Sequence, residues 1–328
     1  MTTLARIRLA VTTGLFLSLA ALVATAGPAA SYPTKPVTFI VPFKAGSAPD
    51  TTFRVLAELA EKDLGQKIVI LNRPGPGGTI GISEVLQSAP DGYTIGMAAL
   101  AGIVLQPLFQ DLPYKGPDDM TLIAQVNEAP TALAVNANAP WRTLEEFLAE
   151  ARKRPGQLTI GMGSGLHTIL HVQAALLEKQ AGVRFSPIPF EAGAQLPALL
   201  GGSIDAAIGQ TVLFSPQAKA GKIRPLAQSG PRRQKGYEEV PTFKDRGFDI
   251  TFVPYEVVIA PKGLPRPAVE KLTGVFKKAT ESQAFKEYAD RRGLEVRYLG
   301  PAELRERLQT DVTVLQRVVE DFGWPKKK

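Results

Sequence analysis

The sequence predicts an α/β protein with largely parallel sheets and more than one domain. Short apolar segments alternate with amphipathic segments along nearly the whole chain. This is the pattern of strands joined by crossover helices. The 328 residues correspond to roughly two domains on a prior of ~150 residues each. The apolar content of 45% and charged content of 21% are ordinary for a globular protein with buried cores.

The first 26 residues are predicted to be a cleaved signal peptide. Two arginines, Arg6 and Arg8, precede the apolar stretch Leu9–Val23, and the small residues of Ala24–Ala26 follow it. A membrane anchor is the alternative, but a span needs ~20 apolar residues, and this stretch is shorter and broken by polar residues. Cleavage is placed after Ala26 or a few residues later, within "GPAAS". We therefore expect export to the periplasm.

Charge and cysteine content exclude several classes of protein. The chain has no cysteine, so it has neither disulfides nor a lipid-anchored cysteine. Removal of the two arginines of the leader lowers the formal charge from +7 to +5. The remaining basic residues are scattered and do not alternate with aromatic residues as a nucleic-acid face would. No nucleic-acid partner is expected, and the lysines at 326–328 are taken as a frayed tail.

The mature chain is predicted to hold ten strands. They are Val37–Phe43, Lys67–Asn72, Tyr93–Ala98, Thr121–Val126, Thr131–Asn136, Leu158–Met162, Arg184–Pro189, Ile204–Gly209, Ile223–Gln228 and Glu256–Ala260. The first helix covers residues 51–64, and Pro301–Gly323 forms the last. Apolar residues of that last helix recur every three or four positions, from Leu304 to Phe322. This single stripe indicates packing on a sheet.

Two similar junctions, each a strand followed by a glycine-bearing loop and a helix, are the candidate binding elements. The first runs from Val37 to Leu64 and the second, "TIGMGSGLHTILHVQAALLEK", from Thr159 to Lys179. Glycine lets a backbone approach a ligand closely. The first turn of the following helix offers unpaired N–H groups and the positive end of its dipole. Such junctions bind anions, so we expect the two loops to hold a carboxylate between them. The alternative is that both loops are only helix caps, with Asp50 capping the first helix.

Catalytic, dinucleotide and metal sites are not expected. "PGPGGTIG" at Pro74–Gly81 places Ile80 where a dinucleotide fingerprint needs its third glycine. In "GMGSGL", Gly163 occupies the nucleophile position of G-x-S-x-G. His167 and His171 are four residues apart on one helix, but no third metal ligand is evident. The chain has only these two histidines, and the loops hold no paired acidic residues. We predict no catalytic residue, no metal and no cofactor.

Several ordered motifs resemble those of one family, the periplasmic solute-binding proteins of tripartite tricarboxylate transporters (the Bug or TctC family). The resemblance runs from about Tyr32 to Trp324. It includes "YPTKPVTFIVPF", "LGQKIVILNRPGPGGTIGISEVLQSAPDGYTIGM", "GSGLHTILHVQAALLE", "PFEAGAQLPALLGGSIDAAIG", "AGKIRPLAQSGPRR" and "VPTFKDRGF". It implies a two-domain clamshell of the periplasmic-binding-protein type, in which each domain is a mainly parallel or mixed sheet flanked by helices and hinge strands join the two.

The resemblance also implies domain limits and site residues. Domain 1 comprises residues 32–132 and 253–328, and domain 2 comprises residues 133–252. The chain crosses to domain 2 near Ala132–Asn136 and returns near Phe252–Ile259. Ligand-binding residues implied by position are Phe43, Lys44, Ala45, Gly46, Ser47, Ala48 and Asp50 in the first loop, Gly163, Ser164, Gly165, His167 and Thr168 in the second, and Ala99, Leu100, Phe190, Gly193, Ala194, Gln210, Thr211 and Tyr255 in the walls.

Three departures from the family pattern concern the ligand. Ala45-Gly46-Ser47 stands where members usually have Pro-Gly-Gly. The preceding Lys44 either reaches a second acidic group or is simply exposed. Tyr255 stands in place of a common Trp, either with its hydroxyl in the pocket or as hinge packing. The apolar wall of Phe43, Leu100 and Phe190 mildly favours an aliphatic or aromatic acid over citrate.

The expected function is that of a monomeric, exported binding protein. It captures a small organic acid by clamshell closure and delivers it to the inner-membrane subunits of a secondary transporter. The alternatives are a ligand sensor that passes its closed form to a signalling receptor and, less favoured, an exported enzyme. The sequence does not choose among carboxylates, because fold analogy does not specify a ligand.

Overall fold

A computed structural model describes residues 32–163, 165–191 and 193–324 of the protein. The predicted signal peptide, Ser164 and the C-terminal lysines lie outside the described residues. Among the described residues, no helix combines the length and apolar character required to span a bilayer.

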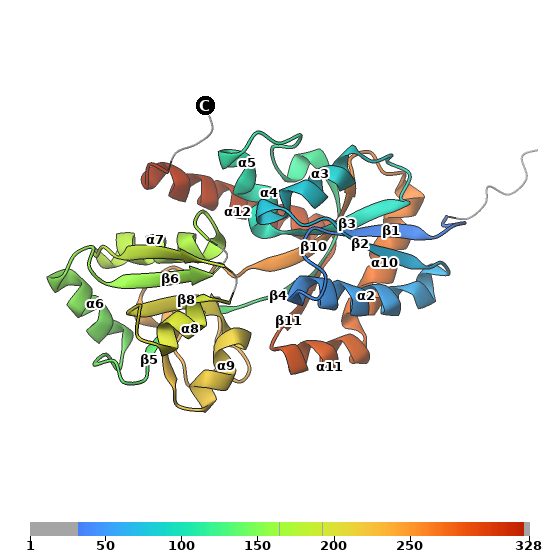
Figure 1. Cartoon of the computed structure of the whole chain (residues 1–328). Coiled ribbons are helices and arrows are strands. Elements are labelled where there is room, and N and C mark those ends of the chain that lie inside the picture. Colours follow the sequence, from blue (N-terminus) through green and yellow to red (C-terminus); the bar gives the residue numbers. More distant parts are fainter. Residues whose placement is uncertain (1–31, 164, 192, 325–328) are drawn as a thin grey trace, which may run out of the picture.

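The described chain forms two sheets, which define two lobes (Figure 1). The first lobe has six strands in the order β11-β4-β10-β3-β1-β2, and the second has five in the order β7-β6-β8-β5-β9. Both sheets are mixed. Strand β1 is parallel to β2 and β3, and β6 is parallel to β7 and β8, whereas β10 and β5 run antiparallel to their neighbours. This arrangement confirms the predicted α/β class.

The first lobe draws on both ends of the chain. Its strands are β1 (Val37–Val41), β2 (Ile68–Asn72), β3 (Thr94–Ala99), β4 (Met120–Glu128), β10 (Tyr255–Pro261) and β11 (Glu295–Leu299). Its helices are α2 (Ala48–Leu64), α3 (Thr79–Gln87), α4 (Leu100–Val104), α5 (Gln106–Phe109), α10 (Arg266–Glu281), α11 (Gln283–Arg292) and α12 (Pro301–Asp321).

The second lobe is continuous in sequence. Its strands are β5 (Thr131–Asn136), β6 (Thr159–Gly163), β7 (Ser186–Phe190), β8 (Ala206–Gln210) and β9 (Ile223–Gln228). Its helices are α6 (Leu144–Lys153), α7 (Ile169–Ala181), α8 (Gln195–Leu200) and α9 (Thr211–Lys219). Short 3-10 turns lie at Pro76–Gly78, Pro117–Asp119 and Lys244–Arg246.

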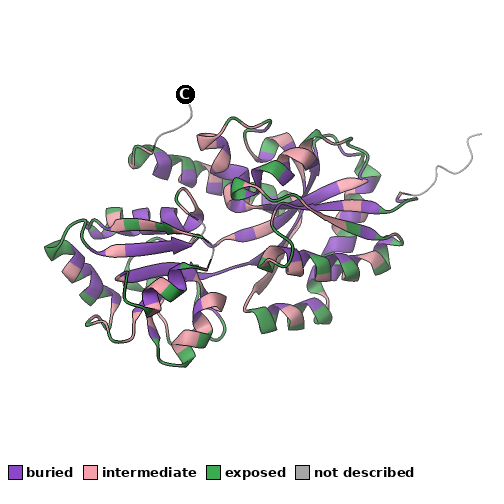
Figure 2. Cartoon of the chain, in the orientation of Figure 1, coloured by how far each residue is buried: buried purple, intermediate pink, exposed green. Residues whose placement is uncertain are grey.

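Each sheet is buried on both faces, as expected for sheets covered by helices. Helices α2 and α10 cover one face of the first sheet, and α3, α4 and α12 cover the other. In the second sheet, α6 and α7 cover one face and α8 and α9 the other. Figure 2 shows buried residues concentrated on the strands of both lobes, with exposed residues on the outer sides of the helices.

The two lobes are joined by two chain crossings and by the packing of α7 against α12. One crossing lies between β4 and β5 and the other precedes β10, and the two meet where the Ala129 amide donates to the Pro254 carbonyl (2.8 Å). Ile169 and Val172 of α7 are buried in the core cluster of the first lobe, together with Leu315 of α12. The first crossing therefore lies at residues 129–130, slightly before the predicted Ala132–Asn136.

Candidate functional site

Strand direction brings the carboxyl ends of the first lobe's parallel strands to the junction between the lobes. The chain leaves this lobe after Glu128 and re-enters it at Tyr255. Because β10 runs antiparallel to β3, its first residues lie beside the end of β3, with Glu256 opposite Ala99. Strand β1 is parallel to β3, so the loop after β1 begins at the same edge.

The second lobe presents the matching edge. Strand β5 starts at the junction, and its antiparallel partner β8 ends there, with Thr131 opposite Gln210. Strands β6 and β7 are parallel to each other, and β6 is parallel to β8, so Gly163 and Phe190 also end at this edge. The two predicted ligand loops therefore begin at sheet edges that both face the junction, where α/β sheets bind their ligands.

The first loop is shaped from within by Asp50. Gly46 has a φ of +80°, and its amide donates to the Asp50 carboxylate (2.8 Å). The same buried carboxylate accepts from Arg54 (3.0 Å) and from Asn72 (2.8 Å). Burial acts to raise the pKa of Asp50, but these hydrogen bonds outweigh it and hold the pKa below its ordinary value. Asp50 therefore organises the loop and is fully engaged there.

A second backbone donor of the first loop is engaged within the loop itself. The Ser47 amide donates to the Lys44 carbonyl (3.1 Å), so it is engaged within the loop. By contrast, the Ser47 hydroxyl is buried without a hydrogen-bond partner among the described residues, although Ser47 is the N-cap of α2. Phe43 is half-buried against the core, and Lys44, Ala45 and Ala48 are exposed. The loop thus offers a sheltered hydroxyl beside the positive end of a 17-residue helix.

The second loop is tied to the neighbouring strand. Gly163 is the buried last residue of β6, and the Gly165 amide donates to the carbonyl of Phe190 at the end of β7 (3.1 Å). Gly165 has a φ of +85°, which favours glycine. Thr168 is the N-cap of α7 but makes no side-chain cap, and its hydroxyl donates to the Gly165 carbonyl (3.3 Å). The first turn of α7 therefore retains its open backbone donors.

The two histidines lie between the lobes in an aromatic cluster. His167 stacks on Phe109 of α5 with ring centroids 4.3 Å apart, and His171 stacks on Trp324, which follows α12, at 4.1 Å. The His167 amide donates to His171 Nδ1 (3.1 Å). Burial, together with the nearby His167, lowers the pKa of His171 to about 4. The structure therefore places this pair in interlobe packing.

Gln195 ends the segment "FEAGAQ" (Phe190–Gln195), which the family resemblance implies as part of the site wall, but it is not among the predicted site residues. Its side chain is 2% exposed and lies against the glycines at the ends of β6 and β8. A Cβ added to Gly163 would come within 2.5 Å of Gln195 Nε2, and one added to Gly209 within 2.9 Å. The Gln195 Oε1 atom is buried without a hydrogen-bond partner among the described residues. Its burial against the two strand ends depends on the fold, and no local pattern in the sequence predicts it.

The other predicted wall residues are not all brought to this edge. Ala99 is partly exposed at the end of β3, and Gln210 is partly exposed at the end of β8. Leu100 and Thr211 are buried, and the Thr211 hydroxyl donates to the Pro130 carbonyl (3.2 Å). Tyr255 is directed instead into the core beneath α12, where it is 1% exposed and its hydroxyl donates to Asp311 (2.7 Å). This contact corresponds to the second of the two roles predicted for Tyr255, packing at the hinge.

Unpartnered polar atoms concentrate at the facing strand ends. Five buried side-chain atoms lack a partner among the described residues, and they belong to Ser47, Gln125, Asn127, Gln195 and Thr280. Ser47, Asn127 and Gln195 all lie at or just beyond the strand ends that meet at the junction. A buried polar group without a partner costs about 1–3 kcal/mol, and such groups call for an explanation such as water or a ligand.

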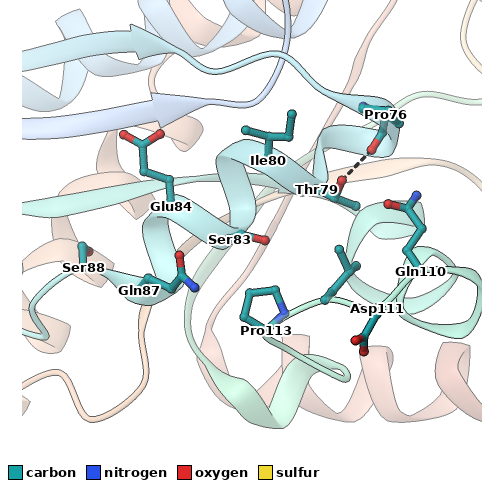
Figure 3. Close-up of a pocket in the computed structure, with 11 residues that line it drawn as sticks. Pro76, Thr79, Ile80, Ser83, Glu84, Gln87, Ser88, Gln110, Asp111 and Pro113 are labelled. Atoms are coloured by element: carbon teal, nitrogen blue, oxygen red, sulfur yellow. Dashed lines mark hydrogen bonds between the residues drawn. The ribbon is translucent and has the colours of Figure 1, made fainter.

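A surface groove occurs elsewhere, between α3 and the segment after α5 (Figure 3). Pro76, Ile80 and Gln87 line one side, and Gln110 and Pro113 the other. None of the predicted site residues lines it. No group of three or more His, Cys, Asp or Glu side chains in the described part of the chain is arranged to hold a metal ion.

Known proteins resemble this chain over nearly its full length. The model of the TctC family, described as the tripartite tricarboxylate transporter family receptor, matches residues 52–324. A protein of Cupriavidus necator, "UPF0065 protein in gbd 5'region", is 32% identical over 311 residues, which cover 94% of each chain.

Solved structures share the fold. A TctC solute-binding protein from Polaromonas, without ligand, has a TM-score of 0.77 and 31% identity, and the match covers 88% of this chain and 99% of that one. MatC from Rhodopseudomonas palustris with bound malate has a TM-score of 0.74 and 28% identity (88% and 100% covered). R. palustris Rpa4515 with adipate has a TM-score of 0.77 and 26% identity (89% and 98%). The two-lobed architecture is thus that of periplasmic binding proteins, and the chain belongs to the TctC family of tripartite tricarboxylate transporter receptors.

Proposed function

We propose that the protein binds a small organic acid between its two lobes and delivers it to a secondary transporter. In this proposal, the first lobe is the predicted domain 1 (residues 32–132 and 253–328) and the second lobe is the predicted domain 2 (residues 133–252), with the first boundary moved to the crossing at residues 129–130. The acid's carboxylate is held by the loops Phe43–Asp50 and Gly163–Thr168, and the lobes close around it. The proposal rests on one observation. Both loops begin at the junction between the lobes, and buried polar atoms near these strand ends lack hydrogen-bond partners among the described residues.

Two further features support carboxylate binding. Each loop leads into the first turn of a helix of thirteen residues or more, and each such terminus stabilises an anion by about 0.3–1 kcal/mol when exposed and more when buried. Two relatives of the same fold were solved with malate and with adipate. Both ligands are small carboxylates, which is the ligand chemistry that the two loops suit.

The sequence of the leader and the family description support export and a transporter partner. The leader of residues 1–26 directs the chain to the periplasm, where it acts as a monomer. The family description as a transporter receptor supports delivery to inner-membrane transporter subunits. The binding role uses no catalytic residue and no cofactor.

Ligand capture is tested on the purified, full-length mature protein. Native mass spectrometry identifies any acid that co-purifies, and thermal unfolding with a panel of carboxylates then ranks affinities. An acid present at a hundred times its dissociation constant adds about 2.7 kcal/mol to the free energy of unfolding. Amines and neutral sugars of similar size serve as negative controls. A panel in which no carboxylate stabilises the protein contradicts the proposal.

Uptake by a deletion strain separates transport from sensing. With the transporter genes expressed from an independent promoter, loss of this protein abolishes uptake of the acid if the protein delivers it. Unchanged uptake with a lost transcriptional response identifies the sensor instead. Recovery of the bound acid unchanged after long incubation distinguishes both roles from that of an enzyme.

A further inference from the structure

A row of residues runs across the first sheet at the edge that faces the second lobe. Strand register pairs Ala99 with Glu256 and Glu256 with Asn127. On the other side, β1 pairs with β3 as far as Ile40 and Gly96, and Phe43 follows two residues after the end of β1. Ala99, Glu256 and Asn127 therefore occupy neighbouring strands, which are spaced ~4.8 Å apart.

These residues also share one face of the sheet. Side chains two residues apart on a strand point to the same side. Val41 on β1, Met97 on β3 and Val258 on β10 all belong to the core cluster beneath α2 and α10. The next positions toward the junction are Phe43, Ala99 and Glu256. The carboxylate of Glu256 thus lies on the α2 side, beside the predicted site residue Ala99.

Glu256 is unusual for a carboxylate at such a place. It is the one charged residue of β10 (Tyr255–Pro261), whose sequence is YEVVIAP. Its side chain is only partly exposed, and burial raises its pKa to about 7. Among the described residues, no lysine, arginine or histidine nitrogen lies within 4.0 Å of its carboxylate. A half-buried carboxylate with no neighbouring cation requires hydrogen-bond donors, which other side chains or a ligand must supply.

Asn127 adds a second unfilled acceptor. Its Nδ2 donates to Glu256 Oε2 (2.8 Å), which fixes the orientation of the amide. Asn127 is fully buried, and its Oδ1 atom has no hydrogen-bond partner among the described residues. Glu256 and Asn127 together therefore present acceptors and no free charge of opposite sign. A ligand with only carboxylates is repelled here by the ionised form of Glu256, whereas an ammonium or hydroxyl group donates to both residues.

We propose that Glu256, positioned by Asn127, is a specificity-determining residue that receives an ammonium or hydroxyl group of the ligand. This inference rests on the proposed function, because the two loops must hold the ligand's carboxylate. It narrows the ligand class to amino or hydroxy acids and disfavours unsubstituted dicarboxylates. An ammonium forms a charge-assisted pair with Glu256, and a hydroxyl forms a hydrogen bond to the same carboxylate.

Matched sets of acids test the proposal by calorimetry on the mature protein. Each set contains an unsubstituted acid and its hydroxy and amino counterparts: succinate, malate and aspartate; glutarate, 2-hydroxyglutarate and glutamate; propanoate, lactate and alanine. We expect a donor-bearing member to bind about tenfold more tightly than its unsubstituted counterpart or better. A preference for the amino member over the hydroxy member identifies the ammonium as the group recognised.

Two variants and a control assign the preference to Glu256. Glu256→Gln is expected to reduce the preference about tenfold and to strengthen binding of the unsubstituted acid, and Glu256→Asp to give an intermediate ratio. Glu58→Gln, on the exposed side of α2, leaves the ratio unchanged. This proposal alone is overturned if the unsubstituted acids bind as tightly as their hydroxy and amino counterparts. It is also overturned if the Glu256→Gln variant keeps the wild-type ratio of these affinities. If none of the acids binds and native mass spectrometry of the purified protein also finds no acid, the proposed function fails and this inference fails with it.

Discussion

Replacing Gln195 with methionine is expected to stabilise the ligand-free protein and to weaken ligand binding. The side chain is 2% exposed, and its Oε1 atom has no partner among the described residues. Such an atom costs about 1–3 kcal/mol. Methionine has a similar length and is flexible, so it fits the space left by Gly163 and Gly209. We expect the free energy of unfolding to rise by about 1 kcal/mol.

The same change removes an amide that we expect the ligand, or a water bound with it, to use. Loss of one such hydrogen bond lowers the affinity for a bound acid by about tenfold. Urea unfolding without ligand measures the first effect, and calorimetry measures the second. Gln309→Met, on the exposed side of α12, is the matched control, and its stability should stay within about 0.5 kcal/mol of wild type. A Gln195→Met protein that is less stable and binds normally would refute this reasoning, because the amide would then serve the fold.

Three further predictions concern the loop, the hinge and the interlobe cluster. Gly46→Ala and Gly263→Ala both force alanine into left-handed backbone with open space around the new methyl group, so each should lower the free energy of unfolding in urea by about 1–2 kcal/mol. Only Gly46→Ala should weaken acid binding. Equal affinities of the two variants would exclude the first loop from the binding site. Tyr255→Phe removes the hydrogen bond to buried Asp311 (2.7 Å). It should lower the free energy of unfolding by about 1.5–3 kcal/mol and leave the affinity for the acid unchanged. Weaker binding with wild-type stability would instead place the Tyr255 hydroxyl in the binding site. His171 has a folded pKa of about 4 against an ordinary 6.5, so the unfolded state binds more protons between these values and stability falls as the pH drops through this window. From pH 7 to pH 5, wild type should lose about 2 kcal/mol more than His171→Gln, and equal losses by chemical unfolding would contradict a buried neutral imidazole.

Local patterns were sufficient to predict most strands and the main helices of the fold. The stretch from Val37 to Leu64 changes from consecutive apolar residues to a helical stripe, and the structure has β1 and α2 there. Strand β11 was missed because Glu295–Leu299 is half-exposed and alternates charged with apolar residues at a sheet edge. Helices α4 and α5 are five and four residues long, too short for a periodic signal.

The candidate site was less accessible from the sequence because it depends on pairing between distant strands. The glycine-bearing loops were visible as local patterns. The row that joins Ala99, Glu256 and Asn127 exists because β10 inserts between β3 and β4 from more than a hundred residues away. Which way Tyr255 points also follows from that register. The shaping of the first loop by Asp50 depends on Asn72 of β2, which no spacing rule connects to it.

The most direct test is a crystal structure of the mature protein with the acid found by native mass spectrometry. We expect the carboxylate between the lobes, within hydrogen-bond distance of donors in Phe43–Asp50 and in Gly163–Thr168. An acid bound in the groove between α3 and the segment after α5, or anywhere that leaves both loops untouched, would contradict the proposed mode of binding.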